Sequence, residues 1–543
     1  MKKIVTLLFA VTLTSALVFV GCQRSGGATT ASSSGGSAAP TASSAPVKLT
    51  VEIFDRGTDG GKTDPTNNKW TQWIHDKLLQ DENIDVTFVG VPRWTETDAL
   101  VNLFAAGTPP DVCYTYSTDN IQMWADMGGI YNVQPYINTT LKDLNAFLGP
   151  DKAIPGKQMI ERNSDMKTGA IYSIPSKRMN VARTIMWIRK DWLDILGIPV
   201  PKTTQEYYDA LVAFRDNAAT LGVSRVIPFI TDGSRLDWGP GVIMDSFIDV
   251  NISDKERWIN SVADRNFLIP GYKEGVRFLN KMYNDGLIDP NFPLYKSGED
   301  VSPVIKSGVV GSWAGDWDTI YREPNGTLSG LRANIPTADV IPVDCITDAN
   351  GVTTKTIYDE AGLFYFIPVS AKDPDAAMRY LNWLSKYENY HFIQTGLEGI
   401  THTIDADGVI KLDASAAADP TWIMNSSQNI DYTMPMNGLF LGTQEESIRA
   451  LSAGYSYSAD IIQHAYNIAL NNGRPSLVVK PTSPLTAAGP LIQTLTDKAS
   501  VMYTQLIICQ PAQFDTQWTS LINDWLASGA QTVVDERRAK YPD

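Results

Sequence analysis

The sequence predicts an α/β fold whose 543 residues form more than one domain. Between residues 47 and 116, strand and helix patterns alternate in the order βαβαβ with short connections, which is typical of a parallel sheet with right-handed crossovers. About 495 residues lie beyond a low-complexity N-terminal segment, and a single hydrophobic core does not grow to that size. We therefore expect two or three domains.

The N-terminus predicts export and attachment to a membrane. Two lysines precede an uncharged apolar run from Ile4 to Gly21, the pattern of a secretory signal peptide, so residues 1–21 are expected to be removed. Gly21 followed by Cys22 resembles the bacterial lipobox, in which the cysteine receives diacylglycerol and becomes the mature N-terminus. The alternative is an ordinary secreted protein with an incidental cysteine. Residues 22–46 are almost entirely Ser, Gly, Ala, Thr and Pro, a composition that predicts a flexible linker.

Composition excludes several classes of partner. Hydrophobic residues make up 43% and charged residues 19%, as in ordinary globular proteins, and the net charge of −15 disfavours nucleic acid or anionic lipid. No later apolar run is long enough to span a bilayer. Cys113, Cys345 and Cys509 are widely spaced and odd in number, so we expect buried thiols rather than a disulfide framework or a metal site.

The elements at the start of the folded part place polar residues on one edge of the sheet. The patterns predict strands over 47–54, 85–91 and 112–116, with helices from about 69 and over 96–106. Ligands of parallel α/β sheets bind at the carboxyl ends of the strands. Arg56 follows the first strand, and Tyr116 and Asp119 follow the third, so these residues are candidates for the binding edge.

Several segments in one order resemble the family 1 extracellular solute-binding proteins of ABC importers. They read FDRG, NKWTQWI, VGVPRW, LFAAGTPPDV and TY, followed by IYSIP and WIRKDWLDILGI. The resemblance extends from about Val47 to about Ile400 and is greatest to the lipoprotein branch that binds alginate and glycosaminoglycan fragments. It implies a binding protein, not an enzyme, which captures an oligosaccharide outside the cell and delivers it to a membrane permease.

The family also implies the fold. Its members have a two-lobed, periplasmic-binding-protein-like fold of type II, in which three crossing segments join the lobes. Here the resemblance places the first lobe at residues 47–178 and 362–428, and the second lobe at residues 179–361 and 429–543. The first crossing falls near Ile174 to Arg183, the chain returns near residues 361–364, and the third crossing falls near Asn425 to Met434.

Local signals predict further elements. Thr203 and Glu206 form a capping box for a helix, another helix over 272–285 ends at Gly286, and a strand covers 185–188. Asp373-Pro374 starts a helix expected to bury Met378, Leu381, Leu384 and Tyr387. Residues 348–351 and 407–408 have the composition of hairpin turns.

Two tryptophan segments are candidates for the sugar site. Sugar rings pack their C–H faces on aromatic planes and hydrogen-bond through their hydroxyls to planar polar groups. The segment Gly311 to Trp317 resembles a family segment that stacks on a pyranose, so Trp313, Asp316 and Trp317 are candidates. Core packing is the alternative to stacking for Trp313, and it is the favoured interpretation for Trp317. Asp237 and Trp238 stand in a predicted loop flanked by Gly239 and Pro240, where an exposed aromatic ring favours ligand binding.

Charged residues complete the candidate site. Arg183 and Lys177 lie near the first crossing, and Arg56 offers a fork of five donors, suited to hydroxyls or to a uronate carboxylate. Glu398 lies in a Gly-x-Glu-Gly turn that resembles one frequent in this branch. Each of these residues has an ordinary alternative as a solvated, ion-paired or structural group. An acidic sugar is one possible ligand among several.

No metal, cofactor or catalytic residue is expected. The alginate-binding branch often carries a calcium loop, but here residues 216–229 lack its alternating Asp and Asn ligands. The four histidines lack metal-ligand spacing, and no nucleophile elbow or P-loop is present. The remaining alternatives are a peptide or other polar solute as ligand, a surface glycoside hydrolase or lyase, and an adhesin. We expect a monomer.

Overall fold

A computed structural model describes residues 45–57, 64–150, 158–165, 168–234, 236–322, 326–344, 355–412, 431–475, 477, 479, 481–483 and 485–542. The chain separates into Met1–Ala45 and a compact unit, Pro46–Asp543, whose fold is described below. The predicted signal peptide and Cys22 lie outside the described residues. So do Cys345, the predicted turn at 348–351 and most of the predicted third crossing.

The first lobe is built on two strand ladders, one parallel and one antiparallel. β1 and β2 pair in parallel, and β10 runs antiparallel to both β3 and β4. A parallel bridge between Val51 and Val112 joins the ladders at the start of β3, which confirms the expected parallel βαβαβ order. The strands are β1 (Val47–Asp55), β2 (Ile84–Pro92), β3 (Cys113–Thr115), β4 (Ile174–Lys177) and β10 (Ala361–Phe366).

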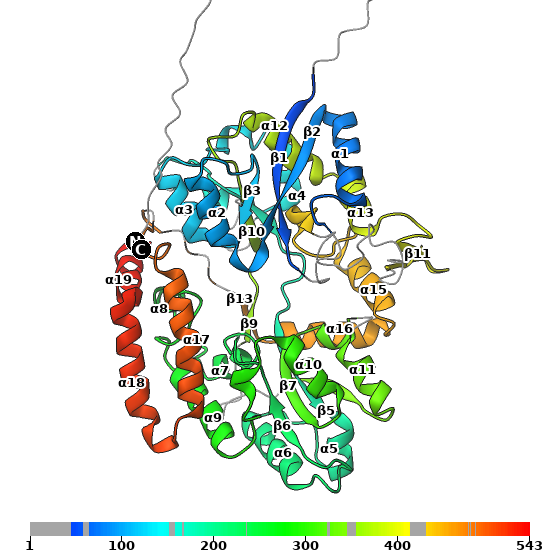
Figure 1. Cartoon of the computed structure of the whole chain (residues 1–543), viewed down its shortest axis with the longest axis vertical. Coiled ribbons are helices and arrows are strands. Elements are labelled where there is room, and N and C mark those ends of the chain that lie inside the picture. The colour runs from blue at the N-terminus through cyan, green and yellow to red at the C-terminus, as the bar shows by residue number, and fades with distance from the viewer. Residues whose placement is uncertain are drawn as a thin grey trace, which may run out of the picture. The chain divides into compact units, whose positions relative to one another are not determined.

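Helices flank these strands (Figure 1). They are α1 (Lys69–Glu82), α2 (Glu96–Ala105), α3 (Thr118–Asp126), α4 (Lys142–Leu148), α12 (Pro374–Leu384) and α13 (Tyr387–Thr395). α1 begins at a reciprocal cap, because the Asn68 side chain accepts from the backbone of Thr71 while Thr71 Oγ1 accepts from the backbone of Asn68. The hairpin of β11 (His402–Ile404) and β12 (Ile410–Leu412) turns at Gly408, as predicted.

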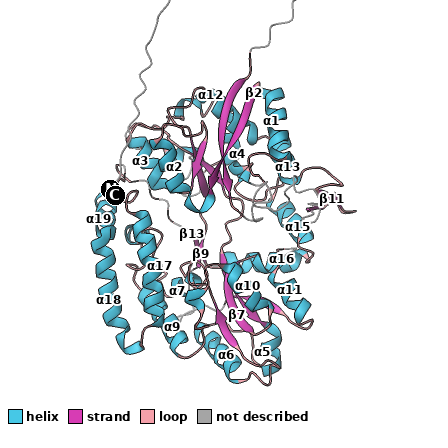
Figure 2. Cartoon of the chain, viewed as in Figure 1, coloured by secondary structure: helices cyan, strands magenta, loops and turns pink. Residues whose placement is uncertain are grey.

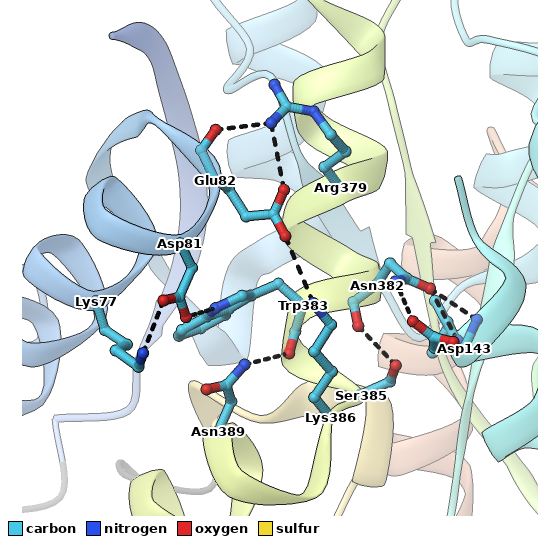
Figure 3. Close-up of polar contacts among 11 residues, drawn as sticks. Lys77, Asp81, Glu82, Asp143, Arg379, Asn382, Trp383, Ser385, Lys386 and Asn389 are labelled. Atoms are coloured by element: carbon cyan, nitrogen blue, oxygen red, sulfur yellow. Dashed lines mark hydrogen bonds and ion pairs between the residues drawn. The ribbon is translucent and has the colours of Figure 1, made fainter. Parts of the chain in front are cut away.

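α12 brings the returning chain back to the first lobe (Figure 3). Asn382 Oδ1 accepts from the backbone N–H groups of Asp143 and Leu144 at the start of α4. On the other side, Trp383 Nε1 donates to Asp81 Oδ2 at 2.9 Å near the end of α1. α12 begins at Asp373 as predicted, but the expectation of a buried Tyr387 is wrong. Tyr387 starts α13 and is 54% exposed, because α12 ends at Leu384.

The second lobe has a four-stranded sheet with the order β6-β7-β5-β8. β6 and β7 are parallel, whereas β5 is antiparallel to β7 and β8. A separate parallel pair joins β9 to β13. The strands are β5 (Thr184–Arg189), β6 (Ile227–Ile230), β7 (Val310–Asp316), β8 (Val340–Val343), β9 (Lys355–Ile357) and β13 (Gly473–Pro475). Figure 2 shows helices on the flanks of this sheet as well.

The helices of the second lobe confirm the local signals. α6 starts at Thr203, whose side chain accepts from Glu206 N, and α9 is followed by Gly286 at φ 72°. Glu206 Oε2 accepts from Lys202 N, so the reciprocal half of the predicted capping box is absent there. The helices are α5 (Lys190–Leu196), α6 (Thr204–Asp216), α7 (Gly241–Asp245), α8 (Asp254–Asn260), α9 (Tyr272–Asn284), α10 (Gly298–Lys306), α11 (Thr327–Asn334), α15 (Gln444–Gly454) and α16 (Ala459–Leu470).

Three C-terminal helices extend the second-lobe core: α17 (Ile492–Ile508), α18 (Phe514–Trp525) and α19 (Gln531–Lys540). Figure 1 shows α17 and α18 side by side, and both contribute to the cluster that contains α9. Asn280 of α9 donates to the carbonyl groups of Leu506, Ile507 and Cys509, which lack partners within α17. The Cys509 and Cys113 thiols are buried and unpaired, as expected.

The hydrophobic cores divide the chain into two lobes. The largest first-lobe cluster takes residues up to Ile174 and again from Leu363, whereas the second-lobe clusters begin at Ala182. The chain therefore crosses between β4 and β5, within the range expected for the first crossing. Tyr432 still packs in the first-lobe core, beyond the boundary assigned from the sequence. Within the described ranges, no helix combines the length and apolar character needed to cross a membrane.

Candidate functional site

A cavity of about 850 Å³ has walls from both lobes. The first lobe contributes Tyr116 and the residues that start α3, at the carboxyl end of β3. The second lobe contributes Arg183, Asp237 and Trp238, and Tyr358 lies where the chain returns to the first lobe. Residues far apart in the sequence therefore meet around one space, large enough for an oligosaccharide of a few rings.

Tyr116 is positioned by aromatic and charged neighbours. Its ring lies parallel to that of Phe54, with centroids 6.2 Å apart, and the Arg93 guanidinium carbon lies 4.4 Å from the Tyr116 centroid. Ser117 then caps α3 by accepting from Asn120 N. At the carboxyl end of β3, the predicted binding edge thus consists of the fixed ring of Tyr116 followed by the capped helix α3.

A buried carboxylate pair supports this wall. Glu96 Oε1 accepts from Thr115 Oγ1 and Tyr116 N, each at 3.0 Å, and its Oε2 accepts from Arg93 at 3.2 Å. Burial nevertheless raises the pKa of Glu96. Glu52 is fully buried in β1, where burial raises its pKa well above the ordinary value, and its Oε1 has no hydrogen-bond partner among the described residues.

Trp238 is the aromatic residue of the second-lobe wall. Its Nε1 donates to Asp316 Oδ1 at 2.8 Å, so Asp316 orients the indole although it does not itself line the cavity. The Arg183 guanidinium carbon lies 4.2 Å from the indole centroid. A half-buried indole held by two contacts offers a fixed apolar plane, as stacking on a sugar ring requires.

The crossing segments add two residues that the sequence analysis missed. Arg178 lies over the Tyr358 ring, 3.9 Å from its centroid, and 6.0 Å from the Tyr116 centroid. Tyr358 also lies 5.6 Å from the Trp238 ring. Neither residue belongs to a recognisable motif, and only the position of Arg178 in the predicted crossing could have drawn attention to it.

Arg93 and Trp94 are further residues that the sequence analysis did not single out. They follow the carboxyl end of β2, and Trp94 is 67% exposed while its Nε1 donates to the carbonyl of Arg56 at 3.4 Å. The rule that selected Arg56 and Tyr116 applies equally to this strand end. It would have found both residues.

Asp237 and Asp245 are carboxylates with partners inside the protein. Asp237 pairs with Arg265 at 3.1 Å. Asp245 accepts from Thr356 and from Asn266, and burial raises its pKa. Both carboxylates line the cavity. The ion pair with Arg265 holds Asp237 in place, so Asp237 is a fixed acceptor rather than a free charge.

Other candidates lie away from the cavity wall. Arg56 makes a two-bond ion pair with buried Asp431, at 2.5 and 2.8 Å, which ties β1 to the segment after residue 430. Glu398 is exposed in the turn after α13 and bridges to His402 through the backbone. The side chain of Asp119 lies outside the described residues, although its neighbours Ser117 and Thr118 line the cavity.

Trp313 and Trp317 are placed in the hydrophobic core. They are 5% and 2% exposed, belong to one second-lobe cluster, and do not line the cavity. The reason is strand geometry, because Trp313 lies within β7 and its side chain belongs to a buried cluster to which α10, α11, α15 and α16 contribute. In this structure neither indole presents a face to the cavity.

Within the described residues, no cluster of three or more His, Cys, Asp or Glu side chains has the arrangement of a metal site. At the end of α6, where the segment that the sequence analysis compared with a calcium loop begins, Asp216 forms an exposed ion pair with Arg215 at 2.7 Å. The Arg215 and Asp216 side chains therefore pair with each other.

Comparison with known proteins is consistent with this architecture. YtcQ of Bacillus subtilis (strain 168), a polygalacturonan/rhamnogalacturonan-binding protein, is 21% identical over 475 residues, which cover 84% of this chain and 85% of YtcQ. FusA of Streptococcus pneumoniae serotype 4, a fructooligosaccharide ABC transporter substrate-binding protein, is 25% identical over 200 residues, or 34% of this chain and 36% of FusA.

A solved structure shares the fold. The crystal structure of the alginate-binding protein AlgQ2 without calcium ion superposes with a TM-score of 0.65 at 16% identity, covering 91% of this chain and 98% of that chain. The family described as bacterial extracellular solute-binding protein matches residues 63–390. This match spans most of the first lobe and the sheet of the second lobe, and the chain therefore belongs to the bacterial extracellular solute-binding protein family, with its two-lobed periplasmic-binding-protein-like fold.

Proposed function

We propose that this protein is the lipid-anchored substrate-binding protein of an ABC importer and that it captures an oligosaccharide between its two lobes. The observation that carries the proposal is the cavity, whose walls come from both lobes and include the half-buried indole of Trp238. The names of the relatives support the ligand class, because YtcQ and FusA are both described as binding polymeric or oligomeric sugars.

Tyr116, Arg183, Asp237 and Trp238 are the proposed ligand contacts. Trp238 supplies a stacking face, Arg183 donates to hydroxyl or carboxylate oxygens, and Asp237 accepts from hydroxyl groups. Asp316 positions Trp238. We leave out Trp313 and Trp317, because they are buried in the core, and Arg56, because Asp431 occupies its guanidinium.

Capture by closure fits this distribution of contacts. A ligand shifts an equilibrium between open and closed forms only if it contacts one form better than the other, and contacts to both lobes do this. The proposed hinge comprises residues 178–183 and 358–360, between β4 and β5 and before β10. Micromolar affinity corresponds to about −8 kcal/mol, which one stacked ring and several hydroxyl hydrogen bonds can supply.

The membrane anchor and the permease are the remaining parts of the proposal. Lipidation of Cys22 would hold the protein at the outer face of the cell membrane, where the linker leaves the lobes free to reach a permease. Metabolic labelling with a palmitate analogue tests the anchor. We expect label on the wild-type protein and none on Cys22→Ala, which should appear in the medium.

Binding of an oligosaccharide is tested with the purified full-length protein in detergent. We expect a thermal-shift screen of plant, mucin and uronic-acid oligosaccharides to find a ligand that raises Tm, and calorimetry to give a saturable isotherm with about one site. Mass spectrometry should recover that oligosaccharide intact. A shortened or unsaturated product would show an enzyme, and stabilisation by peptides alone would show a different ligand class.

A further inference from the structure

Three guanidinium groups and three aromatic rings form a continuous ladder along one side of the cavity. Arg93 lies over Tyr116, Arg178 over Tyr358, and Arg183 over Trp238, with distances from guanidinium carbon to ring centroid of 4.4, 3.9 and 4.2 Å. The pairs are linked, because Arg178 is 6.0 Å from Tyr116 and Arg183 is 5.8 Å from Tyr358. We call these six residues the arginine–aromatic ladder.

The ladder connects the two lobes through the hinge. Tyr116 belongs to the first lobe and Trp238 to the second, whereas Arg178, Tyr358 and Arg183 lie on the crossing segments. All three rings and Arg183 line the cavity, and Arg93 and Arg178 lie against rings that do. A ligand that spans the cavity would therefore pass along the three rings and Arg183, with Arg93 and Arg178 behind two of these rings.

Arg183 differs from the other cations of the cavity wall. In the described part of the chain, every other arginine or lysine that lines the cavity has a carboxylate or carbonyl partner; these are Arg162, Arg257, Arg265, Lys355, Arg474 and Arg537. No described side chain accepts a hydrogen bond from Arg183 or lies within ion-pair distance of it, although the charge of the buried Asp245 interacts with it at longer range. Arg178 likewise has no carboxylate within ion-pair distance among the described residues.

The unpaired donors of the ladder point to a missing partner. Arg93, Arg178 and Arg183 each have a buried Nε–H for which no described residue supplies an acceptor. A buried donor left unpaired costs about 1–3 kcal/mol, so three in one row need compensation. Stacking on a ring holds the plane of each guanidinium in place, and a fixed plane is what bidentate recognition of a carboxylate needs.

We propose that the arginine–aromatic ladder selects an oligosaccharide that carries carboxylate groups, with sugar rings stacked on the aromatic faces and carboxylates bound by Arg183 and Arg178. The proposal rests on the proposed function and specifies its ligand. A neutral sugar can accept hydrogen bonds from the guanidinium groups but cannot neutralise their charges. The selection of carboxylates must be local, because the chain as a whole carries a net charge of −15.

Matched ligand pairs test the role of charge directly. Linear trisaccharides of galacturonate, mannuronate and glucuronate are titrated calorimetrically into the full-length protein, each as the carboxylate and as its methyl ester, beside neutral trisaccharides of the parent sugars. We expect at least one carboxylate form to bind and its ester to bind at least about tenfold more weakly, since esterification removes the charge-assisted hydrogen bonds.

Variants locate the effect on the ladder. Arg183→Gln and Arg178→Gln should each weaken binding of the acidic trisaccharide by about tenfold or more and weaken binding of the ester by a much smaller factor, because glutamine keeps a donor for uncharged oxygens and loses only the charge and the fork. Arg183→Lys should fall between Arg183→Gln and the wild type, because it keeps the charge and loses the fork. The control is Arg538→Gln, which removes one charge from an exposed residue of α19. It should bind like the wild type.

The outcomes separate this inference from the proposed function. Equal affinity for acid and ester, or tight binding of neutral trisaccharides only, would overturn the selection of carboxylates and leave an oligosaccharide-binding protein. Loss of both acid and ester binding in the Gln variants would also overturn it, because the arginines would then act through shape. If no sugar in this panel or in the wider oligosaccharide screen binds, the proposed function itself fails.

Discussion

Arg183 and Trp238 form a stacked pair on the cavity wall, with 4.2 Å between the guanidinium carbon and the indole centroid. One partner comes from the hinge and the other from a second-lobe loop between β6 and α7. The stacking leaves the guanidinium edge free to donate, and the hydrogen bond from Trp238 to Asp316 prevents the ring from rotating away. The pair is thus organised before any ligand arrives, which lowers the entropic cost of binding.

The first prediction concerns this indole. Trp238→Ala should weaken oligosaccharide binding by at least about tenfold, because it removes the stacking plane and the support of Arg183. Trp238→Phe should lose less, since a ring remains although the donor to Asp316 is gone. Calorimetric titration of the oligosaccharide found by the thermal-shift screen measures both. An unchanged Kd for Trp238→Ala would remove this residue from the site.

The second prediction concerns Trp313, for which the structure suggests a role in stability. The side chain is 5% exposed and lies in the second-lobe core, so Trp313→Ala should lower the free energy of unfolding by about 3–5 kcal/mol. Urea unfolding followed by circular dichroism checks this value. The fraction that remains folded should bind sugar with the affinity of the wild type, and a weaker Kd at unchanged stability would restore Trp313 to the ligand site.

Much of the fold could be predicted from local patterns. The alternation of apolar residues in β1 and the Asp373-Pro374 start of α12 each depend on neighbours within a few residues, and the structure confirms both. Such signals act over one turn or one strand and need no knowledge of the tertiary structure. The position where a strand ends was equally informative, since it led to Tyr116.

The candidate site could be predicted only in part, because its contacts join distant residues. Trp313 and Trp238 both lie within two residues of a glycine in the sequence, yet Trp313 packs in the core of the second lobe and Trp238 lines the cavity. Arg56 follows a strand and Arg183 precedes one, and neither position indicates whether the guanidinium has a carboxylate partner. Only the fold brings Asp431 to Arg56 and leaves Arg183 without a carboxylate within ion-pair distance in the described part of the chain. Pairings across hundreds of residues leave no local pattern.

The third prediction is a dependence of stability on pH through Glu52. Burial raises the pKa of Glu52 well above its ordinary value of 4.5. Between these two pKa values, Glu52 is protonated in the folded protein and ionised in the unfolded chain. The contribution of this group is therefore complete below about pH 4.5 and is lost as pH rises towards the folded-state pKa. Glu52→Gln removes the ionisation and should stabilise the protein increasingly at higher pH.

Urea unfolding of the wild type and Glu52→Gln at about pH 5 and about pH 8 measures this effect. The difference in free energy of unfolding should be small at the lower pH and should grow by about 1.4 kcal/mol for each pH unit below the folded-state pKa. The exposed Glu445 provides the control, since Glu445→Gln should give the same small difference at both values. A constant offset for Glu52→Gln would contradict the buried ionisation.

The last prediction concerns the attachment of the returning chain to the first lobe. Asn382 is 9% exposed, and its Oδ1 accepts from two backbone N–H groups of α4, at 2.9 and 3.0 Å (Figure 3). Asn382→Ala would leave both donors unpaired at a helix start, where no backbone carbonyl can replace the lost acceptor. We therefore expect a loss of about 1–3 kcal/mol in the free energy of unfolding.

Arg379 provides a matched comparison on the same helix. Its ion pair with Glu82 lies at 3.3 Å and its side chain is 29% exposed, so solvent screens the interaction. Arg379→Gln should cost no more than about 1 kcal/mol. Urea unfolding of the two variants ranks them directly.

Because α12 carries the chain back from the hinge, loosening its contact with α4 in Asn382→Ala should also speed hydrogen exchange in β10 more than in β7, whose sheet belongs to the other lobe. Equal exchange rates in the two strands would show that Asn382 stabilises only its own helix.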